Sequence, residues 1–199
     1  MSMADPRRGS QFDNLFTANP DPWNFETSDY EREKFATTVM ALPSERMGHV
    51  LEIGCAFGTL SALLLERCDQ LTGVDVSEVA IERARNRQLP GANFVRGEIP
   101  PDWPEGTFDA VVISEILYFL APEEIRVTAQ LTAQALPKGG TCLLVNWTGP
   151  NTCAVDGNEA ADLFTKQALD EGLRVISKTM HDGYRIDLLA HCGRVVQTS

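Results

Sequence analysis

VLEIGCAFGTL, residues 50–60, is the stretch that decides the fold. Mostly apolar residues lead into two glycines, Gly54 and Gly58, and a leucine-rich segment follows. This order is typical of a buried strand that turns sharply into a helix, because glycine permits the backbone conformations that such a turn needs. The stretch also places a carboxylate, Glu52, inside the buried strand, where an ionisable group needs an explanation.

The same strand-then-helix pattern repeats along the chain. Strands are predicted over 49–54, 71–76, 92–98, 108–114 and 141–147, and helices over 30–42, 59–68, 77–87, 123–136 and 158–170. Residues 172–191 read as an antiparallel hairpin whose turn, 181–183, holds a glycine. Repeated strand–helix units require right-handed crossovers and a parallel sheet. The predicted fold class is therefore α/β, with a mainly parallel seven-stranded sheet that ends in an antiparallel hairpin.

The amino-acid composition limits the number of domains, the kinds of partner and the location that we expect. The 199 residues, 43% hydrophobic, suit a single domain over 1–199, in which the polar residues 1–29 are expected to be partly mobile. A net charge of −11 would repel a phosphate backbone, so nucleic acid is excluded as a partner and a small cationic or neutral molecule is favoured. No apolar run approaches the roughly 20 residues that cross a bilayer, and no signal peptide is evident, so no membrane partner and a cytoplasmic location are expected.

Metal and disulfide chemistry are not indicated. The five cysteines are scattered without a C-x-x-C pair, and the three histidines show no ligand spacing with them. Reduced thiols and no metal site are expected.

Candidate binding residues follow the strands, because ligands of such sheets bind beyond the carboxyl ends of the strands. Asp75 ends the second strand 21 residues after Gly54, a spacing at which a carboxylate can hold the hydroxyls of a ribose. Glu98 follows the third strand and Glu115 the fourth. The plainer alternatives stay open: Asp75 caps the next helix, Glu98 is a surface residue, and Glu115 is an acid favoured by a helix dipole.

The glycine loop does not suit a pyrophosphate. The G-x-G-x-x-G pattern of dinucleotide sites would need glycine at 56 and 59, where this chain has Ala56 and Thr59. With Glu52 close to the loop, the strand ends suit a nucleoside that carries a positive charge.

Five segments in order, VLEIGCAFG, LTGVDVS, FVRGE, FDAVVISEILYFL and LPKGG, resemble the motifs of S-adenosylmethionine-dependent methyltransferases of the seven-stranded, Rossmann-like kind. More narrowly, DPWNFETSDYEREK, EIGCA, SEILYFL and TCAVDGNEAADLFTKQALDEGLRV resemble nodulation protein S-like methyltransferases, which methylate the free amine of a de-acetylated chitooligosaccharide. One departure is Ala56, where a third glycine is common. The resemblance implies a three-layer Rossmann-like fold, with S-adenosyl-L-methionine as cofactor and S-adenosyl-L-homocysteine as product.

The resemblance also implies roles. Glu52 would lie behind the methionine end of the cofactor, and Asp75 would take the ribose. Trp23 and Tyr30 would form a lid within residues 1–45, or would only anchor that segment. The implied cofactor-binding set is Trp23, Tyr30, Glu52, Gly54 (through its carbonyl), Cys55, Ala56, Gly58, Asp75, Val76, Gly97, Glu98, Ile99 and Ser114.

An amine acceptor must lose its proton before it attacks. Glu115 is the candidate base, with Tyr118 and Asn146 as orienting groups, while His181 and His191 are rivals for the base. The expected acceptor is the amine of a de-acetylated amino sugar. O-methylation of another small metabolite and a cofactor-binding module without catalysis remain alternatives, and the oligomeric state is not predicted.

A nicotinamide-dependent reductase is disfavoured. Tyr30 and Lys34 fit the Tyr-x-x-x-Lys pattern of such enzymes, but they precede the glycine loop instead of following it.

Overall fold

The computed structural model describes residues 8–43 and 45–191, which form two compact units, one up to Pro104 and one from Glu105. The first unit contains α1 (Arg8–Ala18), α2 (Asp29–Met40), β1 (Met47–Ile53), α3 (Thr59–Leu64), β2 (Cys68–Asp75), α4 (Glu78–Asn86) and β3 (Ala92–Arg96). The second contains β4 (Ala110–Ser114), the 3₁₀ helix η1 (Leu117–Phe119), α5 (Pro122–Ala135), β5 (Thr141–Trp147), α6 (Gly157–Asp170), β6 (Leu173–Met180) and β7 (Tyr184–His191).

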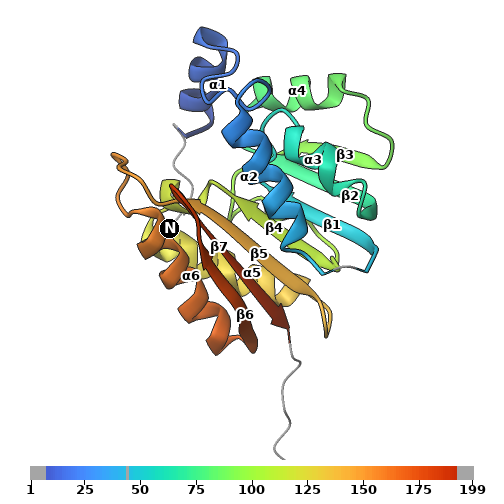
Figure 1. The fold of residues 1–199 in the computed structure, drawn as a ribbon, viewed down its shortest axis with the longest axis vertical. Coiled ribbons are helices and arrows are strands. Elements are labelled where there is room, and N and C mark those ends of the chain that lie inside the picture. The colour runs from blue at the N-terminus through green and yellow to red at the C-terminus, as the bar shows by residue number, and fades with distance from the viewer. Residues whose placement is uncertain (1–7, 44, 192–199) are drawn as a thin grey trace, which may run out of the picture. The chain divides into compact units, whose positions relative to one another are not determined.

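The strand order is β3-β2-β1-β4-β5-β7-β6 (Figure 1). β1, β2 and β3 pair in parallel, as do β4 and β5, whereas β7 runs antiparallel to both β5 and β6. The predicted α/β class, with a mainly parallel seven-stranded sheet and a C-terminal antiparallel hairpin, is confirmed. At the hairpin turn Gly183 has a φ of 82°, which explains why glycine is needed there.

In the first unit, apolar strand residues are covered by α3 and α4, which pack on β2. Ser77 caps α4 as its position before the helical pattern indicates, and its Oγ accepts the N–H of Ala80 at 3.1 Å. α3 is shorter than the predicted 59–68. It ends at Leu64 because Cys68 already pairs with Met47 of β1 and belongs to β2.

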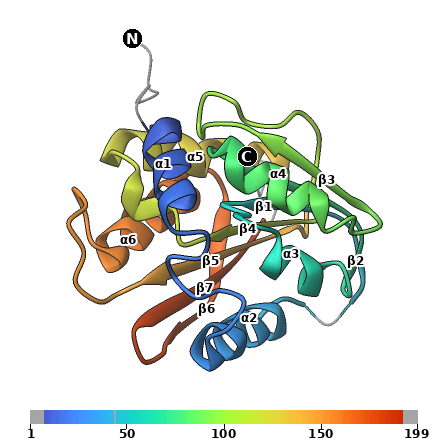
Figure 2. The ribbon, with the colours of Figure 1, turned by 90° about the horizontal axis from the view of Figure 1, so that it is seen from above.

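Helix α1 lies within a segment expected to be partly mobile, of which residues 1–7 fall outside the described part of the chain. Although the helix is mostly polar, it contains two aromatic residues one turn apart, Phe12 and Phe16. Phe16 is buried, and its ring lies 4.9 Å from that of Phe57. Phe16 shares this buried cluster with Ala80 of α4, which explains why α1 packs against α4, as Figures 1 and 2 show.

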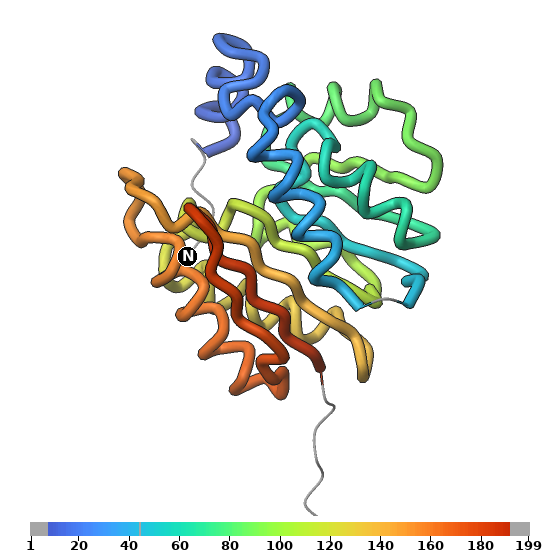
Figure 3. Tube along the Cα trace, in the orientation of Figure 1, coloured from blue at the N-terminus to red at the C-terminus, as the bar shows by residue number. Residues whose placement is uncertain are grey.

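In the second unit, α6 packs on β5, β6 and β7, and α5 packs beside α6. Figure 3 traces the hairpin of β6 and β7. β7 carries a buried ion pair in which Arg185 donates to both carboxylate oxygens of Asp187, at 2.7 and 3.0 Å. Both side chains are about 1% exposed, and Arg185 also reaches Asp162 of α6 at 2.7 Å. A charge buried to this extent depends on its partners.

Among the described residues, none of the helices is both long enough and apolar enough to cross a bilayer.

Arg185→Met is expected to lower the free energy of unfolding by about 3–5 kcal/mol, because it leaves the Asp187 carboxylate buried without its cation. Urea denaturation measures the loss. The matched variant Arg185→Met/Asp187→Leu removes both charges and should recover most of it. If the unfolding free energy of Arg185→Met lies within about 1 kcal/mol of the parent's, the buried pair does not contribute to stability as expected.

Candidate active site

The loop between β1 and α3 bends through three residues with positive φ. Gly54, Ala56 and Gly58 have φ values of 83°, 44° and 76°. The Cβ that a side chain would add at Gly58 would lie 3.1 Å from the Phe94 ring, so glycine lets α3 approach β3 closely. Ala56 adopts a conformation that glycine takes more easily, which explains why the motif commonly holds glycine there.

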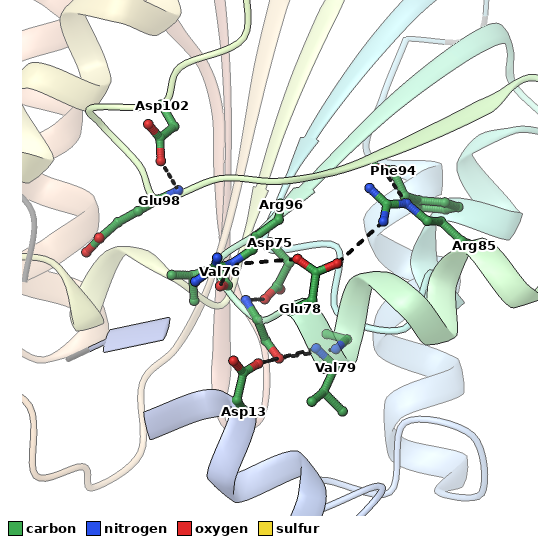
Figure 4. Close-up of polar contacts among 12 residues, drawn as sticks. Asp13, Asp75, Val76, Glu78, Val79, Arg85, Phe94, Arg96, Glu98 and Asp102 are labelled. Carbon is green, nitrogen blue, oxygen red and sulfur yellow. Dashed lines mark hydrogen bonds and ion pairs between the residues drawn. The ribbon is translucent and has the colours of Figure 1, made fainter. Parts of the chain in front are cut away.

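Asp75 holds this loop. Its Oδ2 accepts the N–H of Ala56 at 3.0 Å and its Oδ1 accepts the N–H of Ser77 at 2.9 Å (Figure 4 shows the group around it). Burial raises the pKa of Asp75 to about 6, although the N–H groups of Ser77 and Ala56 oppose the rise. A carboxylate offers about four acceptor positions, so Asp75 can accept further hydrogen bonds. Asp75 can therefore both accept the N–H at the start of α4 and bind a ligand.

Glu52 lies behind the loop and is 1% exposed. The hydroxyl of Ser61 donates to its Oε2 and so joins β1 to α3. Burial, together with the charge of Asp75, raises the pKa of Glu52 to about 8, against the effect of the Ser61 bond. Glu52 is therefore mostly protonated at neutral pH and can ionise when a positive charge comes near.

Sequence reasoning missed two polar residues of α1. Asp13 accepts the Ser77 hydroxyl at 2.6 Å and the Val79 N–H at 3.3 Å, which places a second carboxylate at the start of α4 (Figure 4). Arg8 forms an ion pair with Glu98 at 2.8 Å. The only signal for these contacts was the spacing of Phe12 and Phe16, which indicates a helix but not its partner.

The residues after β3 are ordered by their own contacts. The Gly97 N–H donates to the carbonyl of Asp75 at 2.9 Å, and the Glu98 N–H donates to Asp102 Oδ2 at 2.9 Å. The Glu98 side chain extends away from Asp75 in Figure 4, and Ile99 is buried. The structure thus brings the end of β3 beside the end of β2, but it binds the Glu98 carboxylate to Arg8.

The remaining predicted residues of the first unit have structural contacts. The centroid of the Trp23 ring lies 5.7 Å from that of Phe16 and 5.5 Å from that of Phe25. These contacts favour the alternative in which Trp23 anchors the N-terminal segment. Lys34 Nζ lies 5.6 Å from the Tyr30 ring. Burial raises the pKa of the Cys55 thiol well above its usual value, so this thiol stays protonated. The Val76 carbonyl accepts from Arg96 at 3.2 Å.

A second cluster lies in the second unit, at the end of β4. Glu115 follows the buried Ser114 and has a φ of 60°, a strained conformation for this residue type. Its Oε2 accepts both the Tyr118 hydroxyl, at 2.8 Å, and the Trp147 N–H, at 2.7 Å. The carboxylate is therefore fixed in orientation, as a reacting group needs to be.

The candidate orienting group and the rival bases differ in their surroundings. Asn146 is fully buried, and neither polar atom of its side chain has a partner among the described residues. His181 stacks on Tyr184 with ring centroids 4.5 Å apart. His191 Nδ1 lies 3.1 Å from the Leu136 carbonyl, at the other end of β7.

The sequence predicts reduced thiols and no metal site. Four cysteines, Cys55, Cys68, Cys142 and Cys153, are free. Cys192 lies outside the described residues. Across 8–43 and 45–191, no three His, Cys, Asp or Glu side chains come together as metal ligands would.

Stability should depend on pH through Glu52. Between pH 6 and 8 the folded state keeps the Glu52 proton that the unfolded state has lost, so the free energy of unfolding falls as pH rises, by up to about 1.4 kcal/mol per pH unit. Urea denaturation across this range measures the slope. Glu52→Gln, which keeps an acceptor for Ser61, should flatten it. An equally steep slope in the variant would assign the titration to another group.

Comparison with known proteins identifies relatives. The sequence model described as Nodulation protein S (NodS) matches residues 13–158. Nodulation protein S of Rhizobium tropici is 32% identical over 127 residues, 62% of this chain and 53% of the relative. Trans-aconitate 2-methyltransferase of Escherichia coli O157:H7 is 30% identical over 125 residues, 60% of this chain and 49% of the relative. The chain thus spans about half the length of the curated relatives it matches.

Solved structures of similar fold are also methyltransferases by their descriptions. A Pseudomonas syringae protein that carries a provisional assignment as a methyltransferase is 32% identical, with a TM-score of 0.70, over 81% of this chain and 98% of that one. N-methyltransferase NodS from Bradyrhizobium japonicum WM9, in complex with S-adenosyl-L-homocysteine, shares the fold at 24% identity and a TM-score of 0.78, over 91% and 97% of the two chains. Because the family model matches well over half of the sequence, the chain belongs to the Nodulation protein S (NodS) family, and the predicted methyltransferase resemblance is confirmed.

Proposed function

We propose that the protein transfers a methyl group from S-adenosyl-L-methionine to the amine of a small acceptor. The observation that carries this proposal is Asp75, a desolvated carboxylate at the end of β2 that also holds the loop between β1 and α3. The loop lacks the glycines of a pyrophosphate site, and two solved relatives of similar fold contain S-adenosyl-L-homocysteine. Single-domain organisation over 1–199, a lid within 1–45 and a cytoplasmic location belong to the same proposal.

The residues of the first unit fit the cofactor chemically. Asp75 has acceptor positions left for both hydroxyls of a ribose. Gly54 offers a backbone carbonyl, and after Gly97 the residues Glu98 and Ile99 supply a carboxylate and an apolar cover for an adenine. Glu52, once ionised, balances a positive charge near the loop. Cys55, Ala56, Gly58 and Val76 would complete the lining in this unit, and Ser114 of the second unit stays a proposed cofactor contact.

When bound, S-adenosyl-L-methionine supplies an electrophilic methyl carbon attached to a sulfonium sulfur. The chain's part is to take the proton from the incoming ammonium group and to align the resulting neutral amine with that carbon. We assign proton removal to Glu115, whose carboxylate is held by Tyr118 and by the Trp147 N–H. As the new C–N bond forms, the C–S bond breaks, and S-adenosyl-L-homocysteine leaves as the neutral thioether.

An amine fits this environment better than an acid. The relatives include trans-aconitate 2-methyltransferases, whose named acceptor is a tricarboxylate. In this chain the Glu115 carboxylate and a net charge of −11 would repel such an acceptor. The nodulation protein S relatives favour the amine of a de-acetylated amino sugar. A product-mass screen of amino sugars, simple amines and hydroxyl acceptors, with labelled cofactor, distinguishes N-methylation from O-methylation and from binding without catalysis.

Asp75→Ala is expected to weaken cofactor binding by roughly 1.5–3 kcal/mol, the range for hydrogen bonds to a charged group. Calorimetry with S-adenosyl-L-homocysteine measures the change. Asp69→Ala is the matched control, since Asp69 is an exposed acid of the same strand that pairs with Arg46. Unchanged affinity in a folded Asp75→Ala protein would remove Asp75 from the site.

Glu115→Gln is expected to keep cofactor affinity and to lose turnover by about 10²-fold or more, as the removal of a general base does. Glutamine retains an oxygen that can accept from Tyr118 and from the Trp147 N–H. Glu123→Gln, an exposed acid of α5, serves as the control. If turnover survives in Glu115→Gln, the base is another group, with His181 the first to test.

A further inference from the structure

Ser77 lies between two carboxylates at the start of α4. Its backbone N–H donates to Asp75 Oδ1 at 2.9 Å, and its hydroxyl donates to Asp13 Oδ1 at 2.6 Å. Asp75 ends β2, whereas Asp13 belongs to α1, far earlier in the sequence. Figure 4 shows Asp13 at the first turn of α4, with Asp75 beside it. One serine thereby connects the N-terminal helix to the carboxylate that we assign to the ribose.

Asp13 determines how the Ser77 hydroxyl is used. A serine hydroxyl has one proton to donate and lone pairs with which to accept. The Ser77 oxygen accepts the N–H of Ala80 at 3.1 Å, as a helix cap does, and its proton goes to Asp13. The 2.6 Å between the two oxygens is typical of a hydroxyl that donates to an ionised carboxylate. Asp13 therefore holds the hydroxyl in one orientation.

Asp13 also caps α4 directly. Its Oδ1 accepts the Val79 N–H at 3.3 Å. The N–H groups in the first turn of a helix have no partner within the helix, so Ser77 and Asp13 each supply an acceptor for one of them. A carboxylate is favoured at this end by the helix dipole. A single side chain of α1 thus holds Ser77 and the first turn of α4 together.

Other contacts keep α1 in its place. The buried Phe16 ring packs against that of Phe57, with centroids 4.9 Å apart, and Arg8 pairs with Glu98 at 2.8 Å. These contacts lie on both sides of Asp13 in the sequence of the helix. The effect of Asp13 on α4 can therefore be separated from the packing of α1 as a whole.

The backbone between Asp75 and Ser77 also touches α1. Gly9 is buried, and a Cβ added there would lie 3.3 Å from the Val76 carbonyl oxygen, so the helix approaches this backbone closely. The segment is thus contacted from the α1 side at Val76 and at the Ser77 hydroxyl. Neither contact involves the side chain of Asp75, which stays available to a ligand.

A ribose hydroxyl needs an acceptor in a fixed place. Asp75 Oδ1 is oriented by the Ser77 N–H, so a shift of Ser77 would move this oxygen as well. Binding groups work best when neighbouring hydrogen bonds lock their orientation before the ligand arrives. Asp13 supplies such a lock, because it fixes the serine that orients Asp75.

We propose that Asp13 is a positioning residue for the ribose-binding carboxylate and acts on Asp75 through Ser77. The inference rests on the proposed function, in particular on the assignment of Asp75 to the ribose. The role belongs to the hydrogen bonds of Asp13 and not to its charge, since the orientation of Ser77 is what Asp13 sets. An asparagine at the same position would keep the oxygen that accepts these bonds.

Calorimetry with two ligands distinguishes this role from a general structural one. The ligands are S-adenosyl-L-homocysteine and the dideoxy analogue that lacks both of its ribose hydroxyls. Asp13→Ala should raise the Kd for S-adenosyl-L-homocysteine about tenfold, the scale of one hydrogen bond to a charged group, and should change the Kd for the analogue by less than about threefold. Asp13→Asn should bind S-adenosyl-L-homocysteine within about threefold of the parent.

Asn14→Ala is the matched control, because Asn14 is the neighbouring polar residue of α1 and is exposed. Its affinity for both ligands should equal that of the parent. Ser77→Ala should weaken binding of S-adenosyl-L-homocysteine more than binding of the analogue. Adding Asp13→Ala to Ser77→Ala should cost less affinity than Asp13→Ala costs in the parent, since the two residues act in series. Should Asp13→Ala fail to fold, Asp13→Asn and Ser77→Ala still test the role.

Three results would overturn the positioning role. They are an Asp13→Ala protein that binds S-adenosyl-L-homocysteine as tightly as the parent, equal losses for both ligands, and an Asp13→Asn protein as weak as Asp13→Ala. The proposed function would survive each of them if Asp75→Ala still weakens binding. A parent that binds no S-adenosyl-L-homocysteine, or a folded Asp75→Ala protein of unchanged affinity, would contradict the ribose assignment, and the role of Asp13 would fail with it.

Discussion

The first unit depends on the hydrogen bonds from the N–H groups of Ala56 and Ser77 to the Asp75 carboxylate. One side chain thereby fixes the loop after β1 and the start of α4, two segments that follow different strands. The bonds also compensate for a backbone strain, since Ala56 has a positive φ. A residue that organises the loop so directly has its position set before any ligand arrives, which is what a binding carboxylate needs.

Burial gives the same region its electrostatic character. The pKa values of Asp75 and Glu52 are both raised by desolvation, so the loop lies beside acids that water no longer stabilises as anions. A positive charge placed there would restore their ionised forms and would be bound in return. Asp13 of α1 adds a third carboxylate at the start of α4. These observations link an otherwise puzzling buried glutamate to a cationic ligand.

Much of the fold was predictable because its signals are local. The apolar strands, the Ser77 cap and the Gly183 turn each depend on a few adjacent residues. Helix α1 was missed because its stability comes from burying Phe16 against Phe57, a contact that no local pattern reveals. The candidate residues at the strand ends were predictable from topology, but their partners were not. The Arg8–Glu98 pair joins residues 90 positions apart, and the bond between Glu115 and the Trp147 N–H joins two strand ends.

The most direct test of the account is a crystal structure of the protein with S-adenosyl-L-homocysteine. The account expects both ribose hydroxyls within about 3 Å of the Asp75 carboxylate oxygens, with the hydrogen bond between Asp75 and the Ala56 N–H still in place. Nucleoside density away from Asp75, or a loop that has given up that bond, would contradict it.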